Sequence, residues 1–191
     1  PPGTRLCFGD ELTGDVLDRT DAGGRLIRFE GSGTLDDALE ALGEVPLPPY
    51  ITTPLQDRER YQTVYSRTLG SAAAPTAGLH FTQDMLSSVV SRGVAVAEVT
   101  LHIGLDTFRP VKTEDLDAHV MHSEWYEISP DCAEVVNNAQ GRVIAVGTTT
   151  VRALESSAQE DGMVHSGAAE TRLFLRPGAK FRVVDAMVTN F

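Results

Sequence analysis

The second half of the chain alternates helical and apolar extended patterns, and this alternation limits the folds open to it. Ser129 and Pro130 begin a helix that reaches Ala139, the apolar strand Arg142–Val146 follows, and a further helix covers Val151–Ala158. Helices that alternate with apolar strands are typical of α/β domains. We therefore predict an α/β fold with a largely parallel sheet or open barrel and helices. Further strands are expected over Val94–Thr100, Thr171–Leu175 and Phe181–Val188.

The first part of the chain has a different pattern. Short strands are predicted over Arg5–Phe8, Thr13–Leu17 and Arg25–Glu30, with a glycine-containing turn before the third. After the glycines at 31 and 33, Thr34 can cap a helix over Leu35–Leu42. The change of pattern predicts a domain boundary, with residues 1–33 in a β-rich piece and residues 34–191 in the α/β domain.

Between these parts, the prolines of Pro46–Ile51 exclude a helix, because each proline restricts the residue before it and removes a backbone donor. This segment should be an extended connector. Helices are then expected over Asp57–Tyr65 and Thr82–Arg92, the second one capped by the Thr82 hydroxyl and ended by Gly93.

Composition bounds the class of protein. The chain has 191 residues and 41% hydrophobic residues, which is enough for a buried core. Its sequence contains no apolar run of the roughly 20 residues that a membrane helix needs, and its start does not resemble a signal peptide. We therefore expect a cytoplasmic protein without membrane contact, in which Cys7 and Cys132 are free thiols.

The net charge of −11 disfavours a nucleic-acid partner when it is taken as a single number. The acidic residues, however, concentrate in residues 1–50 and 113–169. Two basic groups remain that can face a polyanion, and ordinary solvated surface explains each of them equally well. They are Arg58, Arg60 and Arg67, and Arg172, Arg176, Lys180 and Arg182.

Polar clusters follow three of the predicted strands. In α/β sheets such loops converge outside the carboxyl ends of the strands, so we expect them to share a site. In the segment GTTTVR, Gly147 allows a tight turn, and Thr148 and Thr149 at a helix start can hold a carboxylate or phosphate. Arg152 can add a charge-assisted bond, although an ordinary threonine cap and an Arg152–Glu155 pair remain equally open. The other two clusters are Leu101–Gly104 and Thr189-Asn190.

Four of the five histidines lie between residues 80 and 122, each beside a residue suited to a loop. Histidine is the usual general acid or base, but a hydrogen-bonded structural role is the commoner one for any single histidine. The spacing of His119 and His122 suits zinc only weakly, because no further ligand lies at a signature distance. We expect no metal. The four histidines are His80, His102, His119 and His122.

The segment APTAGLHF offers Thr76, Gly78 and His80 on an irregular backbone set by Pro75. A binding loop and a buried crossover loop are equally compatible with its composition.

These segments occur in one order that resembles the S-adenosylmethionine:tRNA ribosyltransferase-isomerase family of queuosine biosynthesis. The resemblance covers residues 46–191 and is specific, because several unusual strings coincide. Residues 1–33 look like the end of the small antiparallel β-barrel domain that this family inserts, and we expect the chain to be an internal fragment. The strings are PLPPYI, YQTVYS, APTAGLHF, VTLHIG, TFRPV, HVMHSEWYEI, VIAVGTTTVRALES and VVDAMVTNF.

The resemblance implies a reaction. Family members transfer the ribosyl moiety of S-adenosylmethionine to 7-aminomethyl-7-deazaguanine at the tRNA wobble position and isomerise it, which gives epoxyqueuosine and releases adenine and methionine. The implied co-substrate is S-adenosylmethionine, the implied partner is the tRNA with this base, and no prosthetic group is expected. We expect a monomer.

This chemistry needs a base beside the sulfonium and a donor for the leaving adenine. The candidate catalytic residues are His80, His102, His119, His122 and Glu124, with Glu155 and Asp185 as other carboxylates able to balance the sulfonium. The candidate residues for binding S-adenosylmethionine are Thr76, Gly78, Gly147, Thr148, Thr149, Arg152 and Asn190.

Two alternatives come from other classes of protein. A non-catalytic RNA-binding module would require both basic groups on one face, and no RNP-type string or GXXG clamp supports it. A metal-dependent hydrolase would require the histidine cluster to bind zinc.

Overall fold

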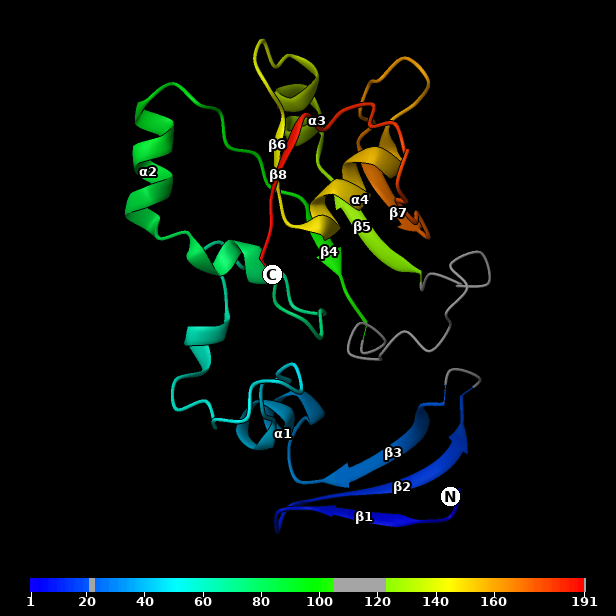
Figure 1. Cartoon of the computed structure of the whole chain (residues 1–191). Coiled ribbons are helices and arrows are strands. Elements are labelled where there is room, and N and C mark those ends of the chain that lie inside the picture. Colours follow the sequence, from blue (N-terminus) through cyan, green and yellow to red (C-terminus); the bar gives the residue numbers. More distant parts are fainter. Residues whose placement is uncertain (21–22, 105–122, 191) are drawn as a thin grey trace. The chain divides into compact units, whose positions relative to one another are not determined.

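The computed structural model describes residues 1–20, 23–104 and 123–190 (Figure 1). The chain divides into two compact units, Pro1–Val45 and Pro46–Phe191. This division falls after the helix over residues 35–42, whereas the predicted boundary lies just before that helix. The assignment of residues 1–33 to the end of an inserted β-barrel stays a prediction.

The N-terminal unit contains an antiparallel sheet and one helix. Strands β1 (Arg5–Phe8), β2 (Leu12–Arg19) and β3 (Arg25–Gly31) pair in the order β1-β2-β3, close to the predicted ranges. Helix α1 (Leu35–Leu42) has the predicted bounds, because the Thr34 hydroxyl accepts a hydrogen bond from the Asp37 amide at 3.1 Å.

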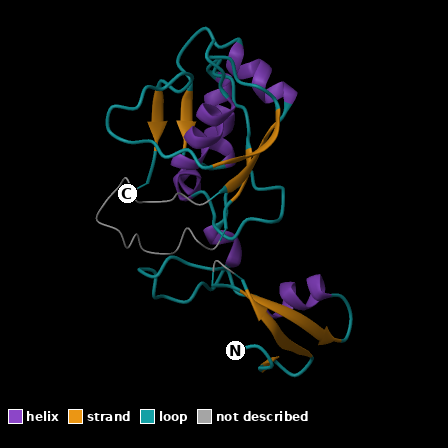
Figure 2. Cartoon of the chain, turned by 90° about the vertical axis from the view of Figure 1, so that its right-hand side faces the viewer, coloured by secondary structure: helices purple, strands orange, loops and turns teal. Residues whose placement is uncertain are grey.

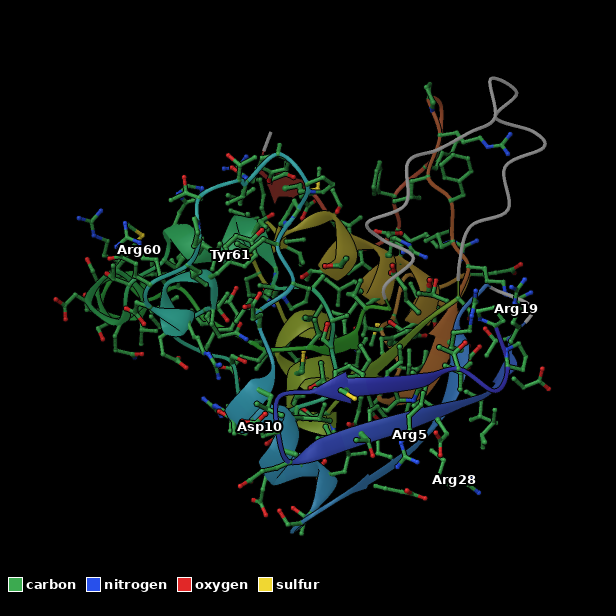
Figure 3. The ribbon with its side chains drawn as sticks, turned by 90° about the horizontal axis from the view of Figure 1, so that it is seen from below. Arg5, Asp10, Arg19, Arg28, Arg60 and Tyr61 are labelled. Carbon is green, nitrogen blue, oxygen red and sulfur yellow. The ribbon has the colours of Figure 1, made fainter. Side chains whose placement is uncertain are left out.

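The two faces of this sheet differ in polarity. Arg5, Asp15 and Arg28 lie opposite one another on the three strands and so share one face, and the side chains of Arg5 and Arg28 are labelled in Figure 3. Leu12 and Val16 of β2 are buried. Because neighbouring strand residues point to opposite faces, the alternation of the sequence places charge on one face and apolar side chains on the other.

The C-terminal unit contains two separate sheets. Strands β4 (Thr100–His102), β5 (Glu124–Ile128) and β7 (Gly167–Thr171) form an antiparallel sheet in the order β4-β5-β7. Strands β6 (Ile144–Val146) and β8 (Ala186–Val188) form a parallel pair, which Figure 2 shows as two arrows pointing the same way.

The predicted mixture of helices and strands is confirmed, but parallel pairing within the described residues is limited to β6 and β8. Alternating helices and strands predict parallel neighbours only when consecutive strands join one sheet. Here β5 and β6 flank a helix but belong to different sheets, so the alternation does not produce a parallel pair at that point.

The helices of this unit begin at recognisable caps. Helix α2 (Gln83–Ser91) follows Thr82, and helix α3 (Pro130–Asn137) follows Ser129, whose hydroxyl accepts from the Cys132 amide at 3.1 Å. Helix α4 (Thr148–Ser157) begins three residues earlier than predicted, directly after Gly147. The threonines of GTTTVR therefore lie inside the first turn of α4.

The predicted helix over Asp57–Tyr65 is wrong. Only the 3-10 turn η1 (Arg58–Tyr61) forms there, and Figure 3 labels its last two residues. The Asp57 carboxylate accepts from the Glu59 amide at 3.0 Å, which favours a short turn, and Gln62 is already extended. A second 3-10 turn, η2 (Thr76–His80), occupies the APTAGLHF segment.

Three strand predictions need correction. The strand predicted over Val94–Thr100 forms only from its last residue onward, as β4. The strand predicted over Thr171–Leu175 lies earlier in the chain, because β7 ends at Thr171, where the predicted strand begins. Of Phe181–Val188, only β8 forms. In the last two cases the backbone groups bond to side chains instead of a neighbouring strand. The Leu173 amide donates to Thr171 Oγ1, and the amides of residues 182–184 donate to Glu155.

The core of the C-terminal unit lies between β5, α3, β6 and α4. Ile128 is 1% exposed and Ala153 is fully buried, and both belong to one cluster of apolar side chains. None of the described helices is both long enough and apolar enough to cross a bilayer. The other members of the cluster are Tyr126, Cys132, Ala133, Ala145, Val151, Leu154, Val164 and Val184.

Ile128→Ala should destabilise the C-terminal unit by about 2–5 kcal/mol, because it removes buried methyl groups and leaves a cavity. Denaturant unfolding followed by the emission of Trp125, the single tryptophan of the chain, reports on this unit alone. Val135→Ala, at a side chain that is 38% exposed, is the matched control. Equal midpoints for both variants would contradict this core.

Candidate functional site

Three segments that lie far apart in the sequence meet in the C-terminal unit. They are η2, the start of α4 at Gly147–Thr150, and the end of β8 at Val188–Asn190, and we call their meeting point the junction. His80 Nε2 lies 3.4 Å from Asn190 Oδ1. The Gly147 amide donates to the Val188 carbonyl at 2.8 Å. Figure 1 shows the C-terminal end of the chain beside η2.

Gly147 at the start of α4 lies near Ala77 of η2. Its φ is +94°, a conformation that side chains other than glycine rarely adopt. A Cβ atom placed on Gly147 would lie 4.0 Å from the Cβ of Ala77, so the buried Ala77 of η2 packs against the start of α4. The predicted shared site combined GTTTVR and Thr189-Asn190 with Leu101–Gly104, and it stays a prediction; in the described residues Gly147 contacts Val188, and Asn190 lies beside His80 of η2.

The start of α4 has no side-chain cap among the described residues. Gly147 supplies no side-chain cap, in contrast to Thr34, Thr82 and Ser129 at the starts of α1, α2 and α3. The first amides of a helix have no partner within the helix, and its dipole places partial positive charge there. Thr150 Oγ1 donates back to the Val146 carbonyl at 2.7 Å, so its hydroxyl is engaged within the fold. Thr148 is exposed and Thr149 half-buried.

The Tyr65 side chain packs against the η2 turn at Gly78. A Cβ atom on Gly78 would lie 1.9 Å from the Tyr65 hydroxyl oxygen and 2.9 Å from Thr63 Cγ2, so only glycine allows this approach. Burial raises the pKa of the Tyr65 hydroxyl, and the negative charge of Glu98 raises it further. Tyr65 and Thr63 were not among the predicted site residues, although both belong to the YQTVYS string.

Gly78→Ala should displace η2 and lower stability, because the new methyl group overlaps the Tyr65 hydroxyl. We expect a loss of about 1–3 kcal/mol, the usual cost of overpacking. Denaturant unfolding by Trp125 emission measures it. Gly141→Ala, where a Cβ atom meets nothing within 4 Å, is the matched control.

A second substitution tests whether overlap with the Tyr65 hydroxyl causes this loss of stability. Tyr65→Phe combined with Gly78→Ala removes the nearest atom and should recover part of the lost stability. The packing of Tyr65 on Gly78 would be excluded if the double variant were no more stable than Gly78→Ala.

His102 has a different environment from His80. It lies within β4 and not in a loop as expected, and its ring meets the Trp125 ring edge-on with centroids 4.7 Å apart. A Cβ atom on Gly70 would lie 2.6 Å from the His102 ring. Within residues 1–20, 23–104 and 123–190, His102 Nε2 is a buried side-chain nitrogen without a hydrogen-bond partner.

His119 and His122 lie outside the described residues. Among the residues that are described, no group of three or more histidine, cysteine, aspartate and glutamate side chains is arranged to hold a metal ion.

Arg152 and Glu124, predicted in separate roles, bind each other. Arg152 Nη1 donates to Glu124 Oε2, and both side chains are 11% exposed. Arg152 Nε donates to the Leu173 carbonyl at 3.0 Å, and Nη2 lies 3.4 Å from the Thr171 carbonyl. The guanidinium group thus joins α4 to β5 and to the segment after β7, and these contacts engage it within the fold.

The other two acidic candidates are also engaged by the backbone. Glu155, one turn after Arg152, does not pair with that arginine. Its carboxylate instead accepts hydrogen bonds from three successive amides of residues 182–184, at 2.8–3.0 Å. Asp185 Oδ2 accepts from the Val143 amide at 2.8 Å. Sequence spacing left an Arg152–Glu155 pair open, but it could not indicate the amides that bind Glu155, because they lie on a distant segment.

Glu124→Gln should lower the stability of the C-terminal unit by about 3–5 kcal/mol, because it leaves the Arg152 charge buried without a counter-charge. Glu98→Gln is the control, because Glu98 pairs with Arg67 on the surface at 3.2 Å, where such a pair contributes about 0–1 kcal/mol. Urea unfolding of both variants measures the difference. Equal losses would show that the Arg152–Glu124 pair is solvated.

Comparison with known proteins agrees with the motifs. The protein family described as queuosine biosynthesis protein matches residues 1–191, so the chain belongs to this family. A relative from Symbiobacterium thermophilum, named S-adenosylmethionine:tRNA ribosyltransferase-isomerase, is 54% identical over 194 residues. A relative of the same name from Clostridioides difficile is 50% identical over 193 residues.

The matched lengths differ between the chain and these relatives. The first alignment covers 100% of this chain and 57% of the relative, and the second covers 99% and 57%. The chain therefore spans somewhat more than half the length of the relatives it matches. A crystal structure of S-adenosylmethionine tRNA ribosyltransferase from Thermotoga maritima aligns over 99% of this chain and 50% of its own, at 27% identity and a TM-score of 0.47.

Proposed function

We propose that the full-length protein transfers the ribosyl moiety of S-adenosylmethionine to 7-aminomethyl-7-deazaguanine at the tRNA wobble position and isomerises it, releasing adenine and methionine. The observation that carries the proposal is the family match over residues 1–191, together with 54% identity to an enzyme named for this activity. That name favours a transferase over a non-catalytic RNA-binding module or a metal-dependent hydrolase.

The junction is the proposed binding site for S-adenosylmethionine. Its methionine carboxylate would accept hydrogen bonds from the first amides of α4, with the Thr148 and Thr149 hydroxyls as further donors. This placement is supported by the missing side-chain cap at Gly147 and by the helix dipole. Thr76 and Gly78 of η2, and Asn190 after β8, would line the same site.

His80 is the proposed proton-transfer residue of the junction. It is exposed and lies on η2 beside Asn190, and histidine is the usual general acid or base. The Asn190 oxygen can only accept, so it would hold His80 in the state with a proton on Nε2. The free Nδ1 could then remove the proton beside the sulfonium.

The other candidates receive narrower roles. His102 keeps a proposed part in proton transfer, supported by its unpartnered Nε2 in the described part of the chain. His119 and His122 stay candidates on sequence grounds alone. Arg152 and Glu124 are proposed to hold α4 against β5 and not to touch the substrate, because each engages the other.

The remaining proposals concern the whole protein. We propose a cytoplasmic, monomeric enzyme that needs no prosthetic group and binds the modified tRNA. We also propose that residues 1–33 end an inserted antiparallel β-barrel, that residues 34–191 belong to the catalytic domain, and that the β6–β8 pair belongs to a larger parallel sheet or open barrel in the full-length protein.

The decisive experiment incubates the full-length protein with S-adenosylmethionine and tRNA carrying 7-aminomethyl-7-deazaguanine and measures released adenine and methionine. His80→Ala should lower turnover by roughly 10²- to 10⁴-fold, the usual contribution of a general acid or base. His165→Ala, at an exposed residue outside the junction, should leave turnover unchanged.

His102→Ala, His119→Ala and His122→Ala complete the series. The acid and base assignment would fail if all four histidine variants kept wild-type turnover. The proposed reaction itself would be excluded if the unsubstituted protein released no adenine.

A further inference from the structure

The carboxylate of Glu155 binds a segment that has no strand partner of its own. Glu155 is 7% exposed. Its Oε2 accepts from the Arg182 amide at 2.8 Å, and its Oε1 accepts from the Val183 and Val184 amides at 3.0 and 2.9 Å. Hydrogen bonds from amides to a charged carboxylate are about twice as strong as neutral ones. Residues 182–184 are therefore held firmly on α4.

These residues lead directly into β8. The strand has three residues, and within the part of the chain that the structure describes it pairs with β6 alone, so its own ladder there contributes few bonds. At its other end, the Val188 carbonyl accepts from the Gly147 amide at 2.8 Å. Gly147 is the residue from which α4 begins. One helix thus holds the entry to β8 through Glu155 and its exit through Gly147.

The position of Asn190 depends on these two contacts, on the bonds that Asp185 and Ala186 make with Val143, and on the pairing of β8 with β6. Asn190 lies two residues beyond Val188, and its Oδ1 lies 3.4 Å from His80 Nε2. A shift of β8 along α4 would move Asn190 relative to the η2 turn, in which Gly78 lies against Tyr65.

We propose that Glu155 is a positioning residue that sets Asn190 beside His80 in the junction. The three amides of residues 182–184 transmit its effect, and Glu155 itself does not touch the substrate. The expected effect of Glu155 on turnover rests on the proposed function, whereas its effect on the position of Asn190 beside His80 does not.

Glu155→Gln is the test variant, because it keeps the shape of the side chain and one acceptor oxygen. Its amide group would face an amide donor of residues 182–184, which removes at least one of the three bonds and turns attraction into repulsion there. Glu160→Gln, at an exposed residue just beyond α4, is the matched control.

The first measurement is the ring resonances of His80 in protein labelled with ¹⁵N-histidine, assigned with His80→Ala. Glu155→Gln should move them in the same direction as Asn190→Ala, while the resonances of the exposed His165 stay in place in both variants. Glu160→Gln should move neither. The proposal is overturned if Asn190→Ala moves the His80 resonances and Glu155→Gln does not, or if Asn190→Ala itself has no effect on them.

A second variant, Glu155→Asp, distinguishes a loss of stability from a loss of positioning. If Glu155→Gln fails to fold, Glu155→Asp keeps the charge but is one methylene shorter, and it should displace the His80 resonances in the same direction. A folded Glu155→Asp protein with His80 resonances at their wild-type values would contradict the proposal.

Turnover provides the second measurement. In the full-length protein, Glu155→Gln should lower kcat by roughly tenfold to a hundredfold, the effect of a small misplacement of a reacting group, with little change in KM for S-adenosylmethionine. A raised KM with unchanged kcat would contradict the positioning role. Absence of turnover in the unsubstituted protein would exclude the proposed function but leave the resonance result intact.

Discussion

The buried guanidinium group of Arg152 links helix α4 to the β4-β5-β7 sheet, in addition to the apolar core that they share. It binds Glu124 at the start of β5 and the carbonyls of Thr171 and Leu173 after β7. A buried charge is costly unless it is paired and hydrogen-bonded, so these partners must all be in place when α4 docks. One of these carbonyls belongs to Thr171, the last residue of β7, and the other to Leu173, two residues beyond it.

Helix α4 organises the C-terminal unit through both of its buried charged side chains. Arg152 and Glu155 lie one turn apart, yet one binds the β4-β5-β7 sheet and the other binds the segment entering β8. The start of the same helix meets η2 and the end of β8. The start of α4 therefore helps to place the groups of the junction.

The sequence predicted the starts of those helices that are capped by a neighbouring side chain. Thr34, Thr82 and Ser129 each cap the helix predicted from them, because a cap involves atoms only a few positions apart. The errors fall where distant groups compete for the backbone. Residues 182–184 look like part of a strand, but their amides bind Glu155, and after Asp57 only the turn η1 forms, beyond which Gln62 is extended and Tyr65 lies against Gly78.

By itself, the sequence determined the family, the helix caps and the segments from which the site is built, because each is encoded in a short string of residues. Only the tertiary structure decided which groups meet. His80 and Asn190 are 110 positions apart, and Glu124 and Arg152 are 28 apart. Whether such residues become partners depends on how α4, η2 and the two sheets pack, and packing sums many weak contacts that no single string of residues contains.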